Sequence, residues 1–181
     1  MPLLIAPCVV SALLPDDGTI GITAIDKRPV AGAVKVNSYG LYADVQADRK
    51  HHGGLDKALY AYAQEDADFW QAQLGRTLEP GWFGENLRVS GIDVNASRVG
   101  ERWRIGGTVE VEVTMPRSPC ATFARWVGGA VERGWVKRFG AEGRLGAYLR
   151  VVRTGAVSAG DAIEVLAVPS DAPTILELFR S

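Results

Sequence analysis

Residues 108–115 read TVEVEVTM, the clearest secondary-structure signal in this chain of 181 residues. Valine or methionine at every second position alternates with threonine or glutamate. Because successive side chains of a β-strand point to opposite faces, this period of two predicts a strand with one buried and one solvated face. The segment MPRSPC, residues 115–120, follows directly.

Shorter strand candidates, separated by glycine-rich turns, lie on both sides of this segment. They cover residues 3–14, 19–25, 33–38, 86–89, 146–153 and 162–168. Helical periodicity covers residues 55–74, 119–127 and 172–180, with room for a short helix through Val131 and Trp135. Many short strands and few helices favour a sandwich or a closed barrel. No repeat or linker divides the chain, so we expect one domain.

Charge and hydropathy exclude several classes of protein. The 20 basic and 21 acidic residues give a net charge of −1, too little positive charge for phosphate-backbone binding. No apolar stretch reaches the roughly 18 to 20 residues of a membrane span. The apolar segment 3–14 lacks the positive n-region of a signal peptide, since the first basic residue is Lys27. We therefore expect a cytoplasmic protein with reduced thiols that binds neither nucleic acid nor membrane.

Histidine and cysteine are scarce: the chain has His51, His52, Cys8 and Cys120. A structural zinc site needs about four clustered thiolate or imidazole ligands, so that class is nearly excluded. Any Ser-His-Asp or Cys-His chemistry must take its base from the one histidine pair.

Cys120 has the more informative surroundings of the two cysteines. Ser118 suits an N-cap and Pro119 the first helical position, which places Cys120 second in the helix, facing free backbone N–H groups with Arg117 close by. These groups favour thiolate over thiol. The alternative is a small apolar residue that fills a strand-to-helix turn, and Cys8, without a charged neighbour, keeps that interpretation.

The segment 51–57, HHGGLDK, leads into the expected 55–74 helix. Backbone N–H groups at Gly53 and Gly54 can approach an anion closely, and His52 and Lys57 add positive charge or hydrogen bonds. The alternative is a simple loop in which Asp56 helps to cap the helix.

Two further segments carry polar groups. GWFGENL, residues 81–87, brings Glu85 and Asn86 into a strand, with a tight turn in which Asn86 bonds its own backbone as the alternative. Lys27 and Arg28 form a basic pair at a strand end. Such a pair is usually solvated surface, and it becomes an anion clamp only if it folds beside the glycine loop.

These segments, in this order, resemble the MOSC family, named for the C-terminal domain of molybdenum cofactor sulfurases, and within it the compact bacterial YiiM-like branch. The matching residues are Lys27-Arg28-Pro29-Val30, Asp44 with Asp48, His52-Gly53-Gly54, Asp56-Lys57-Ala58, Ala61-Tyr62, Phe83-Gly84-Glu85-Asn86-Leu87, Pro116-Arg117, Pro119-Cys120, Gly146 with Tyr148, Gly155 and Gly160-Asp161.

The resemblance implies a mainly β fold: a closed β-barrel with helical insertions over residues 1–168 and a short helical tail over 169–181. It also implies a molybdenum cofactor (molybdopterin) whose metal is bound by Cys120. The implied activity is reduction of N-hydroxylated compounds, including hydroxylaminopurine bases, with electrons from a separate flavin or iron–sulfur partner. A soft thiolate suits a metal already held by dithiolene sulfurs.

On this interpretation the catalytic residues are Cys120 and His52, which orients the cofactor or passes a proton. The expected cofactor-binding residues are Lys27, Arg28, Gly53, Gly54, Asp56, Lys57, Asn86 and Arg117. His51 is expected in a solvated loop.

Two other functions stay open. One is a non-enzymatic carrier of the cofactor or of a sulfane sulfur on Cys120; the other is a thiol hydrolase that uses Cys120 and His52, for which no oxyanion hole is evident. The chain is too short for the pyridoxal phosphate domain of the sulfurases or for a flavin or ferredoxin module, so we expect it neither to mobilise sulfur nor to collect electrons from a nicotinamide alone. YiiM-like chains often continue into a small helical extension, of which this sequence has only the beginning, so partner docking through that extension is left open. We expect a small-molecule substrate, and its identity is left open, as is the formation of a homodimer.

Overall fold

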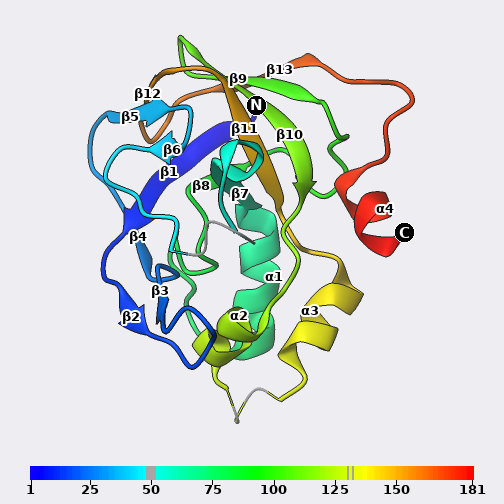
Figure 1. Ribbon diagram of the computed structural model, residues 1–181. Helices are drawn as coiled ribbons and strands as arrows, with labels where there is room; N and C mark the ends of the chain where they lie inside the picture. The colour runs from blue at the N-terminus through cyan, green and yellow to red at the C-terminus, as the bar shows by residue number, and fades with distance from the viewer. Residues whose placement is uncertain (48–51, 130, 132) are drawn as a thin grey trace.

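A computed structural model describes residues 1–47, 52–129, 131 and 133–181 (Figure 1). Its largest sheet has eight strands in the order β13-β9-β10-β11-β7-β8-β1-β4. Their bounds are β13 Ile163–Ala167, β9 Arg102–Ile105, β10 Val109–Pro116, β11 Ala147–Arg153, β7 Leu59–Ala63, β8 Leu87–Ser90, β1 Leu3–Val10 and β4 Lys27–Pro29. All neighbours are antiparallel except β7 and β8, which are parallel.

Two small sheets and five short helical segments complete the described fold. β12 (Gly155–Val157), β5 (Val34–Asn37) and β6 (Gly40–Leu41) form one sheet, and β2 (Leu14–Pro15) and β3 (Ile22–Thr23) form the other. The helices are η1 Leu55–Lys57, α1 Gln64–Leu74, α2 Ala121–Val127, α3 Trp135–Glu142 and α4 Ile175–Arg180. No helix in the described part of the chain is both long and apolar enough to cross a membrane.

The expected closed β-barrel is wrong, although the chain is mainly β. Among the described residues no sheet closes, and the edge strands β13 and β4 of the large sheet do not pair with each other. An isolated bridge joins Leu3 to Ala162. One bridge is not the continuous ladder that a barrel requires, and the short strands β5, β6 and β12 pair in a sheet of their own. The division into a domain over 1–168 and a tail over 169–181 stays a prediction.

The alternating segment forms β10 as predicted, with Val109, Val111 and Val113 fully buried. The other strand predictions are confirmed with shorter or slightly shifted bounds, except that most of 19–25 lies outside strands. Strand β9, which pairs with β10, was not predicted from the sequence.

The predicted helix over 55–74 is correct only in its second half. Residues 55–57 form η1, and β7 (LYAYA) then runs between β11 and β8 with every residue buried. A strand buried on both faces is an unbroken apolar segment, which periodicity alone does not distinguish from a helix. Of the predicted 55–74 helix, only the part that forms α1, Gln64–Leu74, is an α-helix.

Helices α1, α2 and α3 lie beneath the sheet (Figure 1). A cluster of aromatic side chains joins them. Trp70 of α1 packs against Trp135 and Phe139 of α3, at ring-centroid distances of 4.7 and 5.3 Å. Phe123 of α2 contacts the same two rings at 5.8 and 5.1 Å. Aromatic pairs of this kind add to the free energy of burial, so α2 is held firmly at the end of β10.

Candidate functional site

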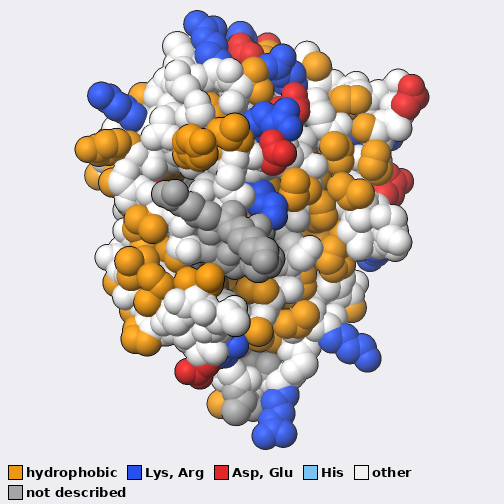
Figure 2. Space-filling model, in the orientation of Figure 1, with side chains coloured by type: hydrophobic (Ala, Val, Ile, Leu, Met, Phe, Trp, Pro, Cys, Tyr) orange, Lys and Arg blue, Asp and Glu red, His pale blue; other side chains and the backbone are white. Residues whose placement is uncertain are grey.

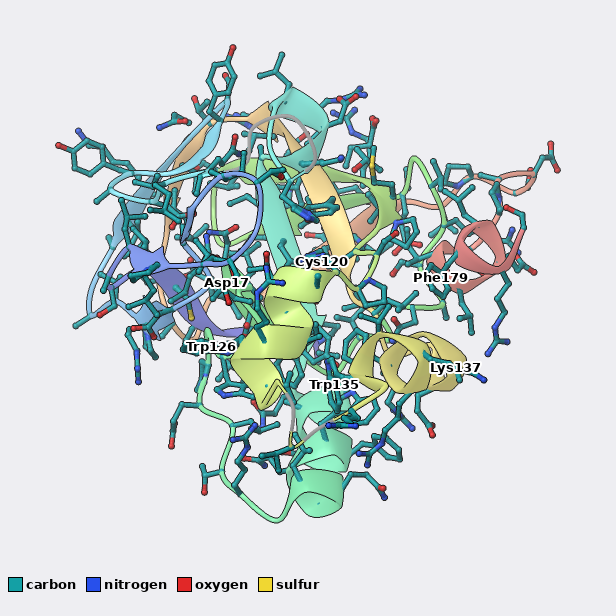
Figure 3. The ribbon with its side chains drawn as sticks, turned by 60° about the horizontal axis from the view of Figure 1, so that its bottom comes forward. Asp17, Cys120, Trp126, Trp135, Lys137 and Phe179 are labelled. Carbon is teal, nitrogen blue, oxygen red and sulfur yellow. The ribbon has the colours of Figure 1, made fainter. Side chains whose placement is uncertain are left out.

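Cys120 lies between β10 and α2, where the chain leaves the sheet (Figure 3). It is the N-cap of α2, not the second helical residue as predicted from Ser118 and Pro119. The reason is its backbone: φ of −134° and ψ of 171° are extended, and its carbonyl accepts the first helical hydrogen bond from Ala124 N–H at 3.0 Å. The side chain is half-buried.

Three donors act on the Cys120 sulfur. Arg117 Nη2 lies 3.6 Å from Sγ, and the His52 side chain and the Phe123 N–H also contribute. Burial raises the pKa of the Cys120 thiol, but His52, Arg117 and Phe123 together outweigh burial and lower that pKa to about 6. Cys120 is therefore mostly thiolate at neutral pH, as its sequence frame predicted.

Tyr148 also contacts His52. Its hydroxyl lies 3.0 Å from His52 Nδ1, and its buried ring comes from the central strand β11. Lys57 Nζ lies 5.8 Å from the centre of the same ring. One rigid strand residue thus contacts both His52 and Lys57, the two basic groups predicted on either side of Gly53-Gly54.

A second polar cluster centres on Asp44. Its carboxylate accepts hydrogen bonds from Lys27 Nζ, from Asn86 Nδ2 at 2.7 Å and from Val10 N–H at 2.9 Å. Asn86 also accepts from Tyr60 N–H at 3.1 Å. Asn86 therefore ties neighbouring strands together instead of bonding its own backbone, and the charge of Lys27 is balanced by Asp44.

These groups face one cavity of about 390 Å³. It is lined by six of the predicted residues: Lys27, His52, Lys57, Asn86, Arg117 and Cys120. Pockets for small molecules usually measure about 300 to 1,000 Å³, so the cavity is large enough for a cofactor or a substrate.

Four predicted residues do not line the cavity: Arg28, Gly53, Gly54 and Asp56. Arg28 is exposed and pairs with Asp26 at 2.8 Å. Asp56 is exposed and pairs with Arg150 at 2.8 Å. The backbone N–H of Gly54, whose φ is 98°, donates to Gln46 Oε1 at 3.0 Å. The glycine loop is therefore hydrogen-bonded to the segment that contains Gln46. His51 and Asp48 lie outside the described residues.

Sequence reasoning missed Asp16, Thr122 and Arg125, which also line the cavity. Arg125 binds Asp16 through two hydrogen bonds of 2.7 Å. The two residues are 109 positions apart, and no motif links them. Tyr148 and Asp44 belong to the matched family segments, but we assigned neither a role.

Glu85 stabilises the turn over residues 81–87 and does not line the cavity. Its carboxylate accepts from Gly81 N–H at 2.7 Å, Phe83 N–H at 2.9 Å and Arg88 Nε at 2.7 Å, and the side chains of Glu85 and Arg88 are both fully buried. The 81–87 turn is thereby fixed, which places Asn86 on the cavity wall.

Basic and acidic side chains are intermixed, both on the surface and in the cavity. On the face shown in Figure 2, the basic side chains at the top lie among acidic ones instead of forming a single patch. The cavity's own cations are close to anions: Lys27 to Asp44, Arg125 to Asp16 and Arg117 to the Cys120 sulfur.

Comparisons with known proteins find a matching family model, curated relatives and solved structures. Residues 48–164 match the MOSC domain. The chain is 37% identical over 150 residues to the uncharacterized protein YflK of Bacillus subtilis, covering 83% of this chain and 66% of YflK. It is 29% identical over 166 residues to a protein named Reductase from Gibberella moniliformis, covering 87% of this chain and 28% of that protein.

Among solved structures, YiiM from Geobacillus stearothermophilus aligns with a TM-score of 0.78 and 25% identity, over 99% of this chain and 83% of that one. The chain thus spans less than two thirds of each of the two curated relatives, yet the matched domain covers well over half of this chain. The chain belongs to the MOSC domain family.

Proposed function

We propose that this MOSC protein is a molybdenum-cofactor-dependent reductase of small N-hydroxylated compounds that takes electrons from a separate flavin or iron–sulfur protein. The observation that carries the proposal is the Cys120 thiolate in a cavity lined by basic groups. One relative is named Reductase, which supports the reaction type. The substrate class and the partner follow from the resemblance to YiiM-like proteins.

The donor set fits a metal that arrives with its own sulfur ligands. Among the described residues, no group of three or more His, Cys, Asp or Glu side chains is placed to hold a metal ion. Cys120 offers one soft thiolate, which suits a metal already bound by the dithiolene of a pterin. When bound, the cofactor supplies the redox chemistry.

The chain's own residues divide the work of binding. Cys120 would bind the metal, and Arg117 and Lys57 would hold anionic groups of the cofactor. Lys27 contributes less net positive charge, because its ammonium group is hydrogen-bonded to the Asp44 carboxylate. The neutral amide of Asn86 donates to the same carboxylate. Arg28 and Asp56 have no place in this set, since they lie outside the cavity.

His52 is the proton carrier of the proposal. Its ring contacts both the Cys120 sulfur and the Tyr148 hydroxyl, and an imidazole N–H is a proton donor. It can therefore deliver a proton to the oxygen that leaves an N-hydroxylated substrate.

A turnover assay tests this function. Protein from a host that makes the cofactor is mixed with a reduced flavin or iron–sulfur donor and a hydroxylaminopurine base, and formation of the amine is followed. We expect turnover by wild type and by Cys8→Ala, and none by Cys120→Ser. Equal turnover by Cys120→Ser would contradict the proposal, and bound cofactor without turnover would favour the carrier function.

A thiol hydrolase is the second candidate, favoured by the contact between Cys120 and His52. It predicts that an ester-type acylating probe labels Cys120 and is then released by water without any metal. Labelling that persists, or none at all, argues against a hydrolase.

A further inference from the structure

The β2–β3 hairpin forms one wall of the cavity that contains Cys120. Gly18, Thr19 and Ile20 from its turn, and Ile22 from β3, all line that cavity. In the described part of the chain β2 and β3 pair only with each other. Ile20 and Ile22 are 49% and 45% exposed and belong neither to the aromatic cluster of the helices nor to the cluster of buried residues that includes Val109, Val111 and Val113 of β10.

One ion pair ties this hairpin to α2. The Asp16 carboxylate accepts from Arg125 Nε and Nη2, both at 2.7 Å, and from Thr122 Oγ1 at 3.0 Å. Thr122 and Arg125 belong to the helix that Cys120 caps, and Figure 3 shows the turn with Asp17 beside the start of that helix. A two-pronged contact between guanidinium and carboxylate is among the stronger polar interactions.

Gly18 leaves room for the pair. It donates to Asp16 Oδ2 at 3.1 Å. A Cβ at this position would lie 2.7 Å from Asp16 Oδ2 and 3.2 Å from Arg125 Nη2. A side chain there would push against both partners, so the turn is shaped to bring carboxylate and guanidinium together.

We propose that the hairpin is a movable wall and that Asp16 and Arg125 are specificity-determining residues, because their ion pair holds it and so limits the size of molecules that reach Cys120. A two-stranded hairpin is marginally stable alone, and segments with few buried contacts open first. The inference deepens the proposed function and rests on it in taking Cys120 as the reacting centre.

The test compares two uncharged reagents of the same chemistry, N-ethylmaleimide and a bulky N-aryl maleimide, on the full chain made in a host that lacks the cofactor. The ratio of bulky to small labelling rates at Cys120 is the readout, since a change in the ionisation of the thiol affects both reagents alike. Cys8 is fully buried and stays unlabelled.

Arg125→Met and Asp16→Asn change the local charge in opposite directions, yet both remove the ion pair. We expect both to raise the ratio by about fivefold or more, the factor that corresponds to roughly 1 kcal/mol. Arg28→Met removes an exposed guanidinium outside the cavity and should leave the ratio of labelling rates unchanged.

Equal ratios in Arg125→Met, Asp16→Asn and Arg28→Met would overturn the inference. A second measurement needs no variant: in wild type, amides of the hairpin should exchange with deuterium faster than those of β10. Equally slow exchange would also overturn it. Neither readout depends on metal or turnover, so failure of the proposed reductase function would be seen separately.

Discussion

Replacing Arg117 with methionine removes the guanidinium nearest to the Cys120 sulfur, at 3.6 Å, while keeping an unbranched side chain of similar length. We expect the pKa of the Cys120 thiol to rise. In wild type that pKa is about 6, because His52, Arg117 and Phe123 together outweigh burial. The variant keeps His52 and Phe123, so the pKa should move only part of the way to its ordinary value of 9.0.

The expected size follows from the hydrogen bond that is lost. A hydrogen bond to a charged group contributes about 1.5 to 3 kcal/mol, which at about 1.4 kcal/mol per pKa unit corresponds to roughly 1 to 2 units. The pKa of Cys120 should therefore reach about 7 to 8. At pH 7 the thiolate fraction would fall from about nine-tenths to between about one half and one-tenth.

The assay is the rate of alkylation by iodoacetamide as a function of pH, on protein without cofactor. Cys8 does not interfere, because it is fully buried and burial raises the pKa of its thiol. Arg28→Met is the matched control and should keep the wild-type midpoint. A midpoint that stays near pH 6 in Arg117→Met would refute the claim that Arg117 stabilises the thiolate.

Three further predictions concern stability. Arg88→Met should lower the free energy of unfolding by about 3 to 5 kcal/mol, because it leaves the Glu85 carboxylate buried without its ionic partner; a loss below 1 kcal/mol in urea denaturation would contradict this. Thr174→Ala should cost about 0.5 to 2 kcal/mol, since it removes the side-chain cap of α4, and amides of α4 should then exchange faster; unchanged exchange would count against the cap. The pKa of Cys120 is lower in the folded chain than the ordinary 9.0, so its contribution to stability is complete above about pH 9 and is lost as pH falls through about 6. The stability of wild type relative to Cys120→Ser should therefore rise from pH 6 to pH 9, by up to about 1.4 kcal/mol per pH unit, and a difference independent of pH would refute it.

The sequence predicted local structure best where one physical rule acts alone. Alternation in TVEVEVTM predicted β10 because one face of that strand is buried and the other is wet. The same reasoning failed at LYAYA, which is buried on both faces between β11 and β8. Whether the sheet closes into a barrel could not be predicted from local sequence either, because closure depends on whether the edge strands β13 and β4 pair, and they do not.

The site was predictable where its groups are close in sequence. Arg117 and Cys120 are three positions apart, and their frame indicated a stabilised thiolate. Tyr148 and His52 are 96 positions apart, so only the packing of β11 against the rest of the sheet brings them together. The position of Arg28 was missed because its strand β4 turns that side chain to solvent.

The central claim is that Cys120 binds the molybdenum of a pterin cofactor, and the most direct test is the molybdenum content of purified protein from a cofactor-competent host. Wild type and Cys8→Ala should carry close to one molybdenum atom per chain, and Cys120→Ser should carry almost none while remaining folded. Equal molybdenum in Cys120→Ser and wild type, or none in wild type, would contradict the account.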